Sequence, residues 1–338
     1  MALSSTQLPQ STIPIFTTIA DYRVWRRQAF KGGKSVGFVP TMGALHEGHL
    51  SLVRRSLAEN DLTVVSIFVN PAQFAPHEDL GTYPRTLPHD LELLEAEAVP
   101  ASTAPSSLHT PTAVFAPTVS EMYPSGIVQN VTEQKGTFVE VKGYGHQMEG
   151  MSRPTFFRGV ATVVTKLFNV VQPTHAYFGQ KDIQQALLLK RLCRDLLLSH
   201  PEPQNLHIIP TARDPVDGLA LSSRNAYLTP EGRAVASTLR LALQAAQSAW
   251  AAGLSKGESI EKATAVVDAK GKEAEEKGLG VSMKLDYVQM NDAQTFEVLD
   301  SGVKRDQTEL VILSGALYVD KTRLIDNILL GDTSGVLE

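Results

Sequence analysis

The stretch that decides the fold is Phe38-Val39-Pro40-Thr41-Met42-Gly43-Ala44-Leu45-His46-Glu47-Gly48-His49. An apolar run ends there in a Pro/Gly turn, and two histidines three residues apart then open a segment with apolar residues at helical spacing. A second apolar run follows over residues 64–69. This order predicts a strand, a turn, a helix and a second strand. The histidines then lie at the helix N-terminus and at the carboxyl end of a parallel strand.

This turn has the chemistry of a phosphate-binding site. A helix N-terminus offers unpaired N–H groups and the positive end of the helix dipole, both of which favour phosphate. Imidazoles at the same place can hydrogen-bond phosphate oxygens or protonate them, so the turn predicts nucleotide chemistry. Two other interpretations stay open. The histidines could only cap the helix, or they could hold zinc, which the spacing disfavours because the zincin motif places its histidines four residues apart.

The composition is that of an ordinary globular protein. A length of 338 residues suggests about two domains, and 43% of the residues are hydrophobic and 20% charged. The net charge of -5 gives no indication of nucleic-acid binding, and no apolar run approaches the length that spans a membrane. Cys193 is the only cysteine, which excludes an intrachain disulfide, and we expect it in a core. The first 20 residues are rich in Ser and Thr, and we expect a frayed extension and a cytoplasmic protein.

The first two thirds of the chain alternate between strand and helix patterns. This alternation predicts an α/β fold with a doubly wound parallel sheet and ligands over the carboxyl ends of its strands. The Pro/Ser/Thr-rich segment 100–111 is expected to be a mobile loop. Strands are expected at residues 35–40, 62–69, 114–116, 176–178 and 206–210, and helices at residues 48–60, 87–98, 159–171 and 181–198.

The pattern changes after residue 211. Helices are expected at residues 231–252 and 259–277, and strands at 285–290, 309–319 and, more weakly patterned, 296–299. Helices followed by a run of strands indicate a smaller α+β domain. We therefore expect domains at 1–211 and 212–338, with the site in the cleft between them.

Two further polar turns follow the strand at residues 62–69. The string SIFVNPAQF (66–74) places Asn70 and Gln73 after that strand, where amides suit a hydroxylated carboxylic acid. The string YPRT (83–86) contains Arg85, which could pair with a carboxylate, and Asp90 near the next helix start could help to hold Mg²⁺. A capping Asn and solvated loop charges are the alternative interpretations.

Two more strings suit an anionic ligand. In FGQKDIQQ (178–185), Lys181 lies at a helix N-terminus, where its charge is unfavourable unless an anion is bound, and Gln184 or Gln185 could reach the pocket. In DGLALSSRN (217–225), hydroxyl and guanidinium groups together could clamp a polyphosphate. A serine-rich surface loop is the alternative interpretation of the second string.

Taken together, the strings resemble the motifs of the pantothenate synthetase (pantoate–β-alanine ligase) family, in that family's order. They are PTMGALHEGH, FVNPAQF, YPRT, SRPTFFRGV, GQKDIQQ, DGLALSSRN and TRLIDN, and the likeness covers roughly residues 16–330. The resemblance implies a Rossmann-like, nucleotidylyltransferase-type sheet with a smaller C-terminal lid domain. It also implies a two-step reaction with ATP and Mg²⁺: pantoate forms a pantoyl adenylate and releases pyrophosphate, and β-alanine then displaces AMP. A homodimer is implied as well.

The resemblance also assigns roles to individual residues. It implies His49 as proton donor, with His46, Lys181 and Arg224 as further catalytic groups, and Gln73 and Gln185 as ligands of pantoate and β-alanine. Asp90 is the implied candidate for Mg²⁺. The implied ATP-binding residues are Met42, Gly43, Ala44, Leu45, His46, Glu47, Gly48, His49, Gly179, Gln180, Lys181, Asp182, Ala212, Leu221, Ser222, Ser223 and Arg224.

Two other functions remain as alternatives. A nucleotidylyltransferase of the same superfold would keep the nucleotidyl group in its product, and the glutamines of FVNPAQF and GQKDIQQ favour the ligase over it. A catalytically silent nucleotide-binding protein would be favoured by the loss of His49, Lys181 or Arg224, and all three are present.

Overall fold

A computed structural model of the chain describes residues 8–76, 78–101 and 104–337. The chain divides into two compact units: Met1–Gly179 with Gln184–Ile209, and Gln180–Ile183 with Pro210–Glu338. This division lies two residues from the boundary expected after residue 211, and it adds the short segment Gln180–Ile183 to the second unit.

The first unit is built on a six-stranded sheet whose neighbouring strands all run parallel. The strand order β1-β6-β3-β2-β7-β8 places β2, where the deciding stretch begins, beside β3 near the centre. The predicted doubly wound parallel sheet is confirmed. The strands are β1 (Ile15–Phe16), β2 (Val36–Thr41), β3 (Leu62–Ile67), β6 (Ala113–Phe115), β7 (His175–Gly179) and β8 (Leu206–Ile209).

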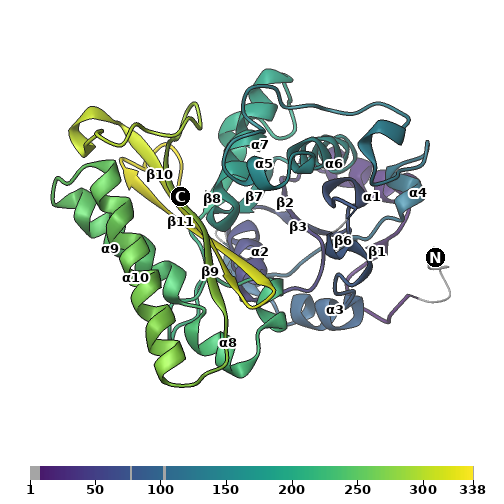
Figure 1. Cartoon of the computed structure of the whole chain (residues 1–338). Helices are drawn as coiled ribbons and strands as arrows, with labels where there is room; N and C mark the ends of the chain where they lie inside the picture. Colours follow the sequence, from purple (N-terminus) through teal and green to yellow (C-terminus); the bar gives the residue numbers. More distant parts are fainter. Residues whose placement is uncertain (1–7, 77, 102–103, 338) are drawn as a thin grey trace. The chain divides into compact units, whose positions relative to one another are not determined.

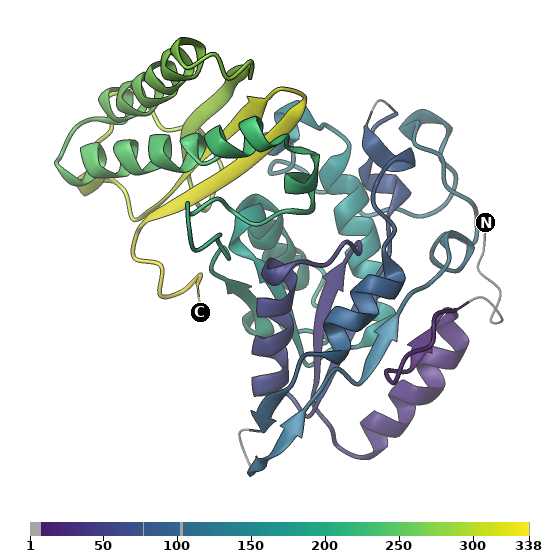
Figure 2. The ribbon, with the colours of Figure 1, turned by 90° about the horizontal axis from the view of Figure 1, so that it is seen from below.

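Helices cover both faces of this sheet. Figure 1 shows α1, α6 and α7 along one face and α2 and α3 along the other, and Figure 2 shows the latter two in front of the strands. Their apolar sides pack on strands such as β2, whose Val36, Phe38 and Val39 are completely buried. The helices are α1 (Ile19–Lys31), α2 (Glu47–Glu59), α3 (Leu87–Glu95), α6 (Phe156–Val171) and α7 (Ile183–Asp195), with short helices α4 (Val119–Met122) and α5 (Glu149–Ser152).

A glycine lets α2 approach the sheet closely. A Cβ atom on Gly37 would collide with Ser56 Oγ and would lie 2.6 Å from Asn60 Nδ2. Both polar groups are buried at the C-terminal end of α2, where Ser56 is hydrogen-bonded to Thr63. The helix that carries the two histidines is therefore fixed closely against β2.

The second unit contains a three-stranded antiparallel sheet with two long helices packed on it (Figure 1). The buried core between them includes Leu243, Trp250, Val267, Leu313 and Leu317. The predicted α+β character is confirmed. The elements are α8 (Pro230–Val235), α9 (Thr238–Ala251), α10 (Lys256–Glu276), β9 (Met283–Asp292), β10 (Leu310–Val319) and β11 (Thr322–Gly331).

Two expectations for the first unit are wrong. The segment 100–111 contributes to a strand pair, β4 (Val99–Ala101) with β5 (Ala104–His109), because main-chain hydrogen bonds form despite its Pro- and Ser-rich composition. The N-terminal segment is not frayed from residue 8 onward: Ser11 and Thr12 donate hydrogen bonds to Glu95, and β1 pairs with β6. Residues 1–7 lie outside the described residues.

Three element boundaries in or next to the second unit also differ from expectation. The helix expected at 231–252 is two helices, because the Ala236 N–H bonds to Arg233 O, three residues back, and interrupts the helical ladder. The segment 296–299 forms only an isolated bridge, since Phe296 has a left-handed φ of 63° that a strand excludes. The helix expected from Lys181 begins at Ile183, after a 3₁₀ turn.

Within the described residues, no helix combines the length and apolar character needed to cross a membrane.

Candidate active site

The turn between β2 and α2 is tightly shaped and places both histidines on the first turn of the helix. Gly43 and Ala44 have positive φ angles of 83° and 50°, which reverse the chain directly after the strand. His46 is the N-cap of α2, and its Nδ1 accepts a hydrogen bond of 3.1 Å from the N–H of Gly48. The ring centroids of His46 and His49 lie 4.1 Å apart. The sequence therefore correctly predicts the strand–turn–helix position of the histidines.

A buried carboxylate holds this turn in place. Asp90 is completely buried, and its oxygens accept hydrogen bonds from the N–H groups of Leu45 (2.8 Å) and Ala44 (3.2 Å) and from the hydroxyl of Thr86 (3.1 Å). Burial raises the pKa of Asp90, and these hydrogen bonds oppose the increase. A Cβ on Gly43 would lie 3.0 Å from Asp90 Oδ2, so the turn and the carboxylate are fitted closely. Through these contacts Asp90 positions the histidine turn, which is a different role from the predicted one as a Mg²⁺ ligand.

Zinc at the histidine turn gains no support. Within the described ranges 8–76, 78–101 and 104–337, no third His, Cys, Asp or Glu joins His46 and His49 in a compact group of metal-ligand atoms.

The second polar turn meets the histidine turn. Gln73 Nε2 lies 3.0 Å from the sulfur of Met42, as expected for turns that follow the neighbouring strands β2 and β3. Gln73 Oε1 accepts a 3.1 Å hydrogen bond from Asn70. Asn70 itself is buried, contacts the Gly159 carbonyl and caps the 3₁₀ turn by accepting from the Ala72 N–H, so it supports Gln73, in line with the alternative interpretation of a capping Asn.

Two residues that sequence reasoning missed fix Asn70 and Gln73. The hydroxyl of Tyr123 donates a 2.6 Å hydrogen bond to Asn70 Oδ1, and burial raises the pKa of Tyr123 so that it stays protonated. Gly159 in α6 lets the helix touch the 3₁₀ turn Pro71–Gln73, because a Cβ there would collide with the Ala72 carbonyl. Only the family-like string around Gly159 could have suggested its importance, and nothing local indicates Tyr123.

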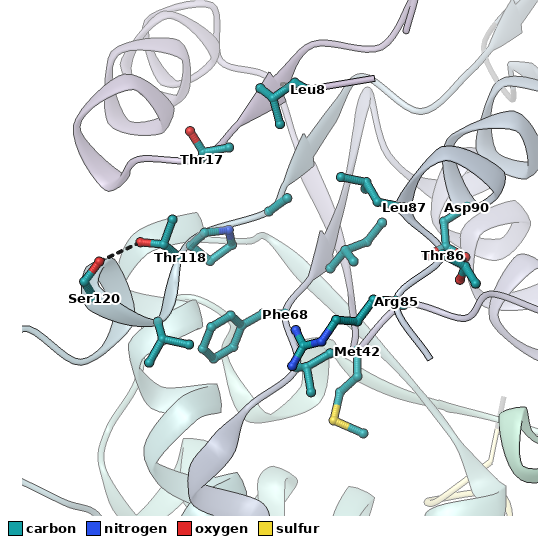
Figure 3. A pocket seen from close by; sticks show the side chains of 16 residues that line it. Leu8, Thr17, Met42, Phe68, Arg85, Thr86, Leu87, Asp90, Thr118 and Ser120 are labelled. Carbon is teal, nitrogen blue, oxygen red and sulfur yellow. Dashed lines mark hydrogen bonds between the residues drawn. The ribbon is translucent and has the colours of Figure 1, made fainter. Parts of the chain in front are cut away.

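A cavity of about 320 Å³ opens at the same edge of the sheet. It is lined by residues that follow β1, β6, β3 and β2, including Met42, Gly43 and Phe68. Figure 3 shows the side chain of Arg85 extending beside Met42 and Phe68. A guanidinium group in this mostly apolar space is suited to a small carboxylate-bearing molecule.

The paired glutamines at the start of α7 have different roles. Gln184 is buried, accepts a hydrogen bond from the Glu149 N–H and donates to the carbonyls of Tyr144 and Gln147. Gln184 therefore anchors the segment that contains α5. Gln185 is half-buried, which makes it the member of the pair that is accessible to a ligand.

In the second unit, the turn Gln180–Asp182 is fixed by the last strand. Asn327 in β11 donates hydrogen bonds to the carbonyls of Gln180 (2.9 Å) and Lys181 (3.0 Å), and its Oδ1 accepts one from the Gln180 side chain. Lys181 Nζ lies 3.6 Å from Asp182 Oδ1. The two hydrogen bonds from Asn327 therefore fix the backbone of the turn that carries the Lys181 ammonium group.

The predicted ATP-binding residues between 212 and 224 lie on one hairpin-like segment of the second unit. Leu221 N–H bonds to the Ala212 carbonyl, and Ser222 caps the 3₁₀ turn that contains Arg224. The missed residue here is Arg213, which forms a two-point ion pair with the buried Asp326 at 2.7 and 2.9 Å. The Arg213–Asp326 ion pair and the hydrogen bonds of Asn327 therefore hold the segments 212–224 and 180–182 on the same strand, β11.

The predicted site residues therefore form two groups, one in each unit. The first unit contains the group Met42–His49, Gln73, Asp90, Gly179 and Gln185. The second unit contains the group Gln180–Asp182, Ala212 and Leu221–Arg224. Each group lies in turns that follow strands or precede helices.

The chain is similar to known proteins over nearly its whole length. The family described as pantoate-beta-alanine ligase matches residues 14–329. The pantoate–β-alanine ligase of Saccharomyces cerevisiae (strain ATCC 204508 / S288c) is 42% identical over 335 residues, with 94% of this chain and 99% of that protein covered. The pantothenate synthetase of Roseiflexus castenholzii (strain DSM 13941 / HLO8) is 46% identical over 317 residues, with the same coverage of 94% and 99%.

Solved structures show the same relationship. Pantothenate synthetase from Thermus thermophilus superposes with a TM-score of 0.74 at 37% identity, covering 94% of this chain and 99% of that one. Pantoate-beta-alanine ligase from Francisella tularensis, described as complexed with beta-gamma ATP and beta-alanine, gives a TM-score of 0.67 at 30% identity over 94% and 98% of the two chains. This chain therefore belongs to the pantoate–β-alanine ligase family.

Proposed function

We propose that this chain condenses pantoate with β-alanine to pantothenate in two ATP-dependent steps. In the first step a carboxylate oxygen of pantoate bonds to the α-phosphorus of ATP, the bond to the β-phosphate bridge breaks, and pyrophosphate leaves. In the second step the β-alanine amine attacks the acyl carbon, the bond to AMP breaks, and the amine loses a proton. The observation that carries this proposal is the β2–α2 turn, with His46 and His49 on the first helical turn.

The first step requires a site that stabilises charge moving onto pyrophosphate. The N-terminus of α2 supplies the positive end of the helix dipole, and His49 is the proposed donor of a proton or a hydrogen bond to a phosphate oxygen. Lys181 and Arg224, from the second unit, are the proposed cationic partners of the phosphates. Bound with the nucleotide, Mg²⁺ would neutralise phosphate charge.

Asp90 acts in this proposal by positioning the phosphate-binding turn. Its two oxygens already accept three hydrogen bonds in a fully buried place, which suits a Mg²⁺ ligand poorly because Mg²⁺ keeps several waters. The Mg²⁺ assignment at Asp90 stays a prediction, and Mg²⁺-dependent activity that survives Asp90→Asn would argue against it.

Gln73 and Gln185 are the proposed ligands of the small substrates. Gln73 is held by Asn70 and Met42 on a turn that α6 supports, so its amide is oriented before a substrate arrives. A fixed amide offers both donor and acceptor to the hydroxyls and carboxylate of pantoate. The homodimer and the cytoplasmic location also stay predictions; light scattering at micromolar concentration checks the first.

The products distinguish this proposal from the nucleotidylyltransferase alternative. With ATP, Mg²⁺, pantoate and β-alanine, we expect equal amounts of pantothenate and free AMP, measured by chromatography and mass spectrometry. A product that retains the nucleotidyl group, or ATP turnover without the amide, would contradict the ligase assignment.

A further inference from the structure

We propose that Glu59, His175 and His207 form a zinc-binding site at the amino-terminal edge of the parallel sheet, on the side away from the histidine turn. The ligand atoms of these three side chains all lie within 4.8 Å of one another. They come from the C-terminal end of α2 and from the beginnings of β7 and β8, and all three belong to the first unit. The proposal is independent of the ligase reaction, because none of the predicted substrate-binding residues takes part.

Strand alternation explains why the two imidazoles lie together. Tyr177 pairs with His207 across β7 and β8, and His175 lies two residues before Tyr177, so all three side chains point to one face of the sheet. The rings confirm this: His207 lies 5.0 Å from both His175 and Tyr177 between centroids, with interplanar angles of 23° and 19°. This face is covered by α2, which ends with Glu59.

The distance between the two imidazoles is close to that of a zinc site. His207 Nε2 and His175 Nδ1 are 3.0 Å apart and share a hydrogen bond when both rings are neutral. Two nitrogens each at 2.0–2.1 Å from a tetrahedral zinc are separated by about 3.3 Å. Small ring rotations would therefore let both nitrogens bind one ion in place of the shared proton.

The carboxylate is oriented by a hydrogen-bond chain. Asn60 donates to the Tyr177 hydroxyl (2.7 Å), which donates to Glu59 Oε2 (2.8 Å). Such outer contacts fix a ligand's orientation and strengthen metal sites. A carboxylate has about four lone-pair positions, so these contacts leave capacity for a cation. His207 is buried and Glu59 is exposed, which gives the site a closed inner side and an open outer side.

One charged neighbour opposes a cation here. Arg55 Nε lies 2.6 Å from Glu59 Oε1, one helical turn away, and its positive charge competes for the carboxylate. The C-terminal dipole of α2 acts in the opposite sense, because the last turn of a helix favours positive charge. Replacing Arg55 should therefore tighten metal binding.

The donor set selects the metal. Two imidazole nitrogens and one carboxylate suit Zn²⁺, whereas Mg²⁺ prefers an all-oxygen octahedral shell. Zinc at this site would join the end of α2 to two strands. It would therefore stabilise the folded chain without entering the reaction.

The test is calorimetric titration of the metal-stripped, full-length protein with ZnCl₂, in the presence and absence of excess MgCl₂. We expect the unmodified chain to bind one more Zn²⁺ ion per chain than His175→Gln binds. Excess Mg²⁺ should not displace this ion. Glu59→Gln should weaken this binding by at least the roughly 10- to 100-fold that the loss of an outer-shell partner costs. Arg55→Gln should strengthen it, and Zn²⁺ should raise the melting temperature of the unmodified chain more than that of His175→Gln.

His89→Gln is the matched control, because exposed His89 also lies beside a carboxylate, with Nδ1 3.3 Å from Glu92, but joins no three-ligand group among the described residues. It should bind Zn²⁺ like the unmodified chain. Melting curves without metal show whether His175→Gln is folded. If it is not, Glu59→Gln decides, because Glu59 is exposed and lies outside both strands. Equal zinc stoichiometry and affinity in the unmodified chain and the decisive variant would overturn the proposal.

Discussion

Pairs of histidines lie near both ends of α2, in opposite electrostatic settings. At its N-terminus, His46 and His49 lie beside the N–H groups of the first turn and the positive end of the helix dipole. At its C-terminus, Glu59 lies near two other histidines, where the dipole is negative. One end is suited to phosphate and the other to a cation. If both proposed sites hold, the direction of the helix, more than the presence of histidines, determines the charge of the ligand.

The largest effect should come from breaking the phosphate end. His49→Ala should reduce turnover by about 10²- to 10⁴-fold, the range for loss of a positioned acid–base group. Lys181→Ala should also abolish most turnover, because it removes a proposed phosphate partner. Steady-state rates of AMP formation measure both effects. Melting temperatures should stay close to that of the unmodified chain, and His89→Ala should keep normal rates; unmodified rates in His49→Ala would contradict its assignment.

The support of the substrate glutamine should be the next most sensitive feature. Gly159→Ala places a Cβ against the Ala72 carbonyl, so α6 and the turn that carries Gln73 must separate. Overpacking of this kind costs about 1–3 kcal/mol. We expect lower stability in urea and a higher KM for pantoate, with a smaller change in KM for ATP. Gly271→Ala is the matched control: apart from its chain neighbours and the nearby backbone of α10, no described atom lies within 4 Å of the new Cβ, so it should stabilise the helix by about 1 kcal/mol.

Asp90→Asn tests how the phosphate-binding turn is held. An amide cannot accept all the hydrogen bonds that Asp90 accepts, so we expect a loss of about 1–3 kcal/mol in unfolding free energy and slower turnover.

The pH dependence has a definite sign. Burial raises the pKa of Asp90 above its ordinary 3.8, so the part of its contribution to stability that depends on protonation is complete below pH 3.8 and is lost as the pH rises through the raised value, while the hydrogen bonds to the turn remain. The stability difference between the unmodified chain and Asp90→Asn should therefore shrink with increasing pH. Urea unfolding of both proteins, from below pH 3.8 upward, measures this difference in unfolding free energy. A difference that grows with pH would contradict a raised pKa at Asp90.

The smallest effect should come from the support of Asn70. Tyr123→Phe removes one hydrogen bond to Asn70 Oδ1 and should cost about 0.5–1.5 kcal/mol. Because Asn70 keeps its contact with the Ala72 N–H, we expect only a modest increase in KM for pantoate. An unchanged unfolding free energy would show that this bond does not stabilise the turn.

Sequence reasoning predicts the elements that have strong local patterns and misses the contacts that connect them. The β2–turn–α2 order follows from apolar periodicity, and the family-like strings contain most of the candidate site. Tyr123 with Asn70, Arg213 with Asp326 and Asn327 with Gln180 join residues 53, 113 and 147 positions apart, so no local spacing reveals them.

The errors have the same origin. The β4–β5 pair forms through main-chain hydrogen bonds in a composition that favours loops. The N-terminal strand β1 has only two residues and is a strand because it pairs with β6. Similarly, His175 and His207 become neighbours only when β7 and β8 pair, and each by itself is an unremarkable histidine in a strand.

The most direct test of the account is isotope exchange between pyrophosphate and ATP, with β-alanine absent. We expect exchange that requires both Mg²⁺ and pantoate, is lost in His49→Ala and is retained in His89→Ala. Exchange without pantoate, or unchanged exchange in His49→Ala, would contradict the claim that the N-terminal end of α2 activates pantoate as an adenylate.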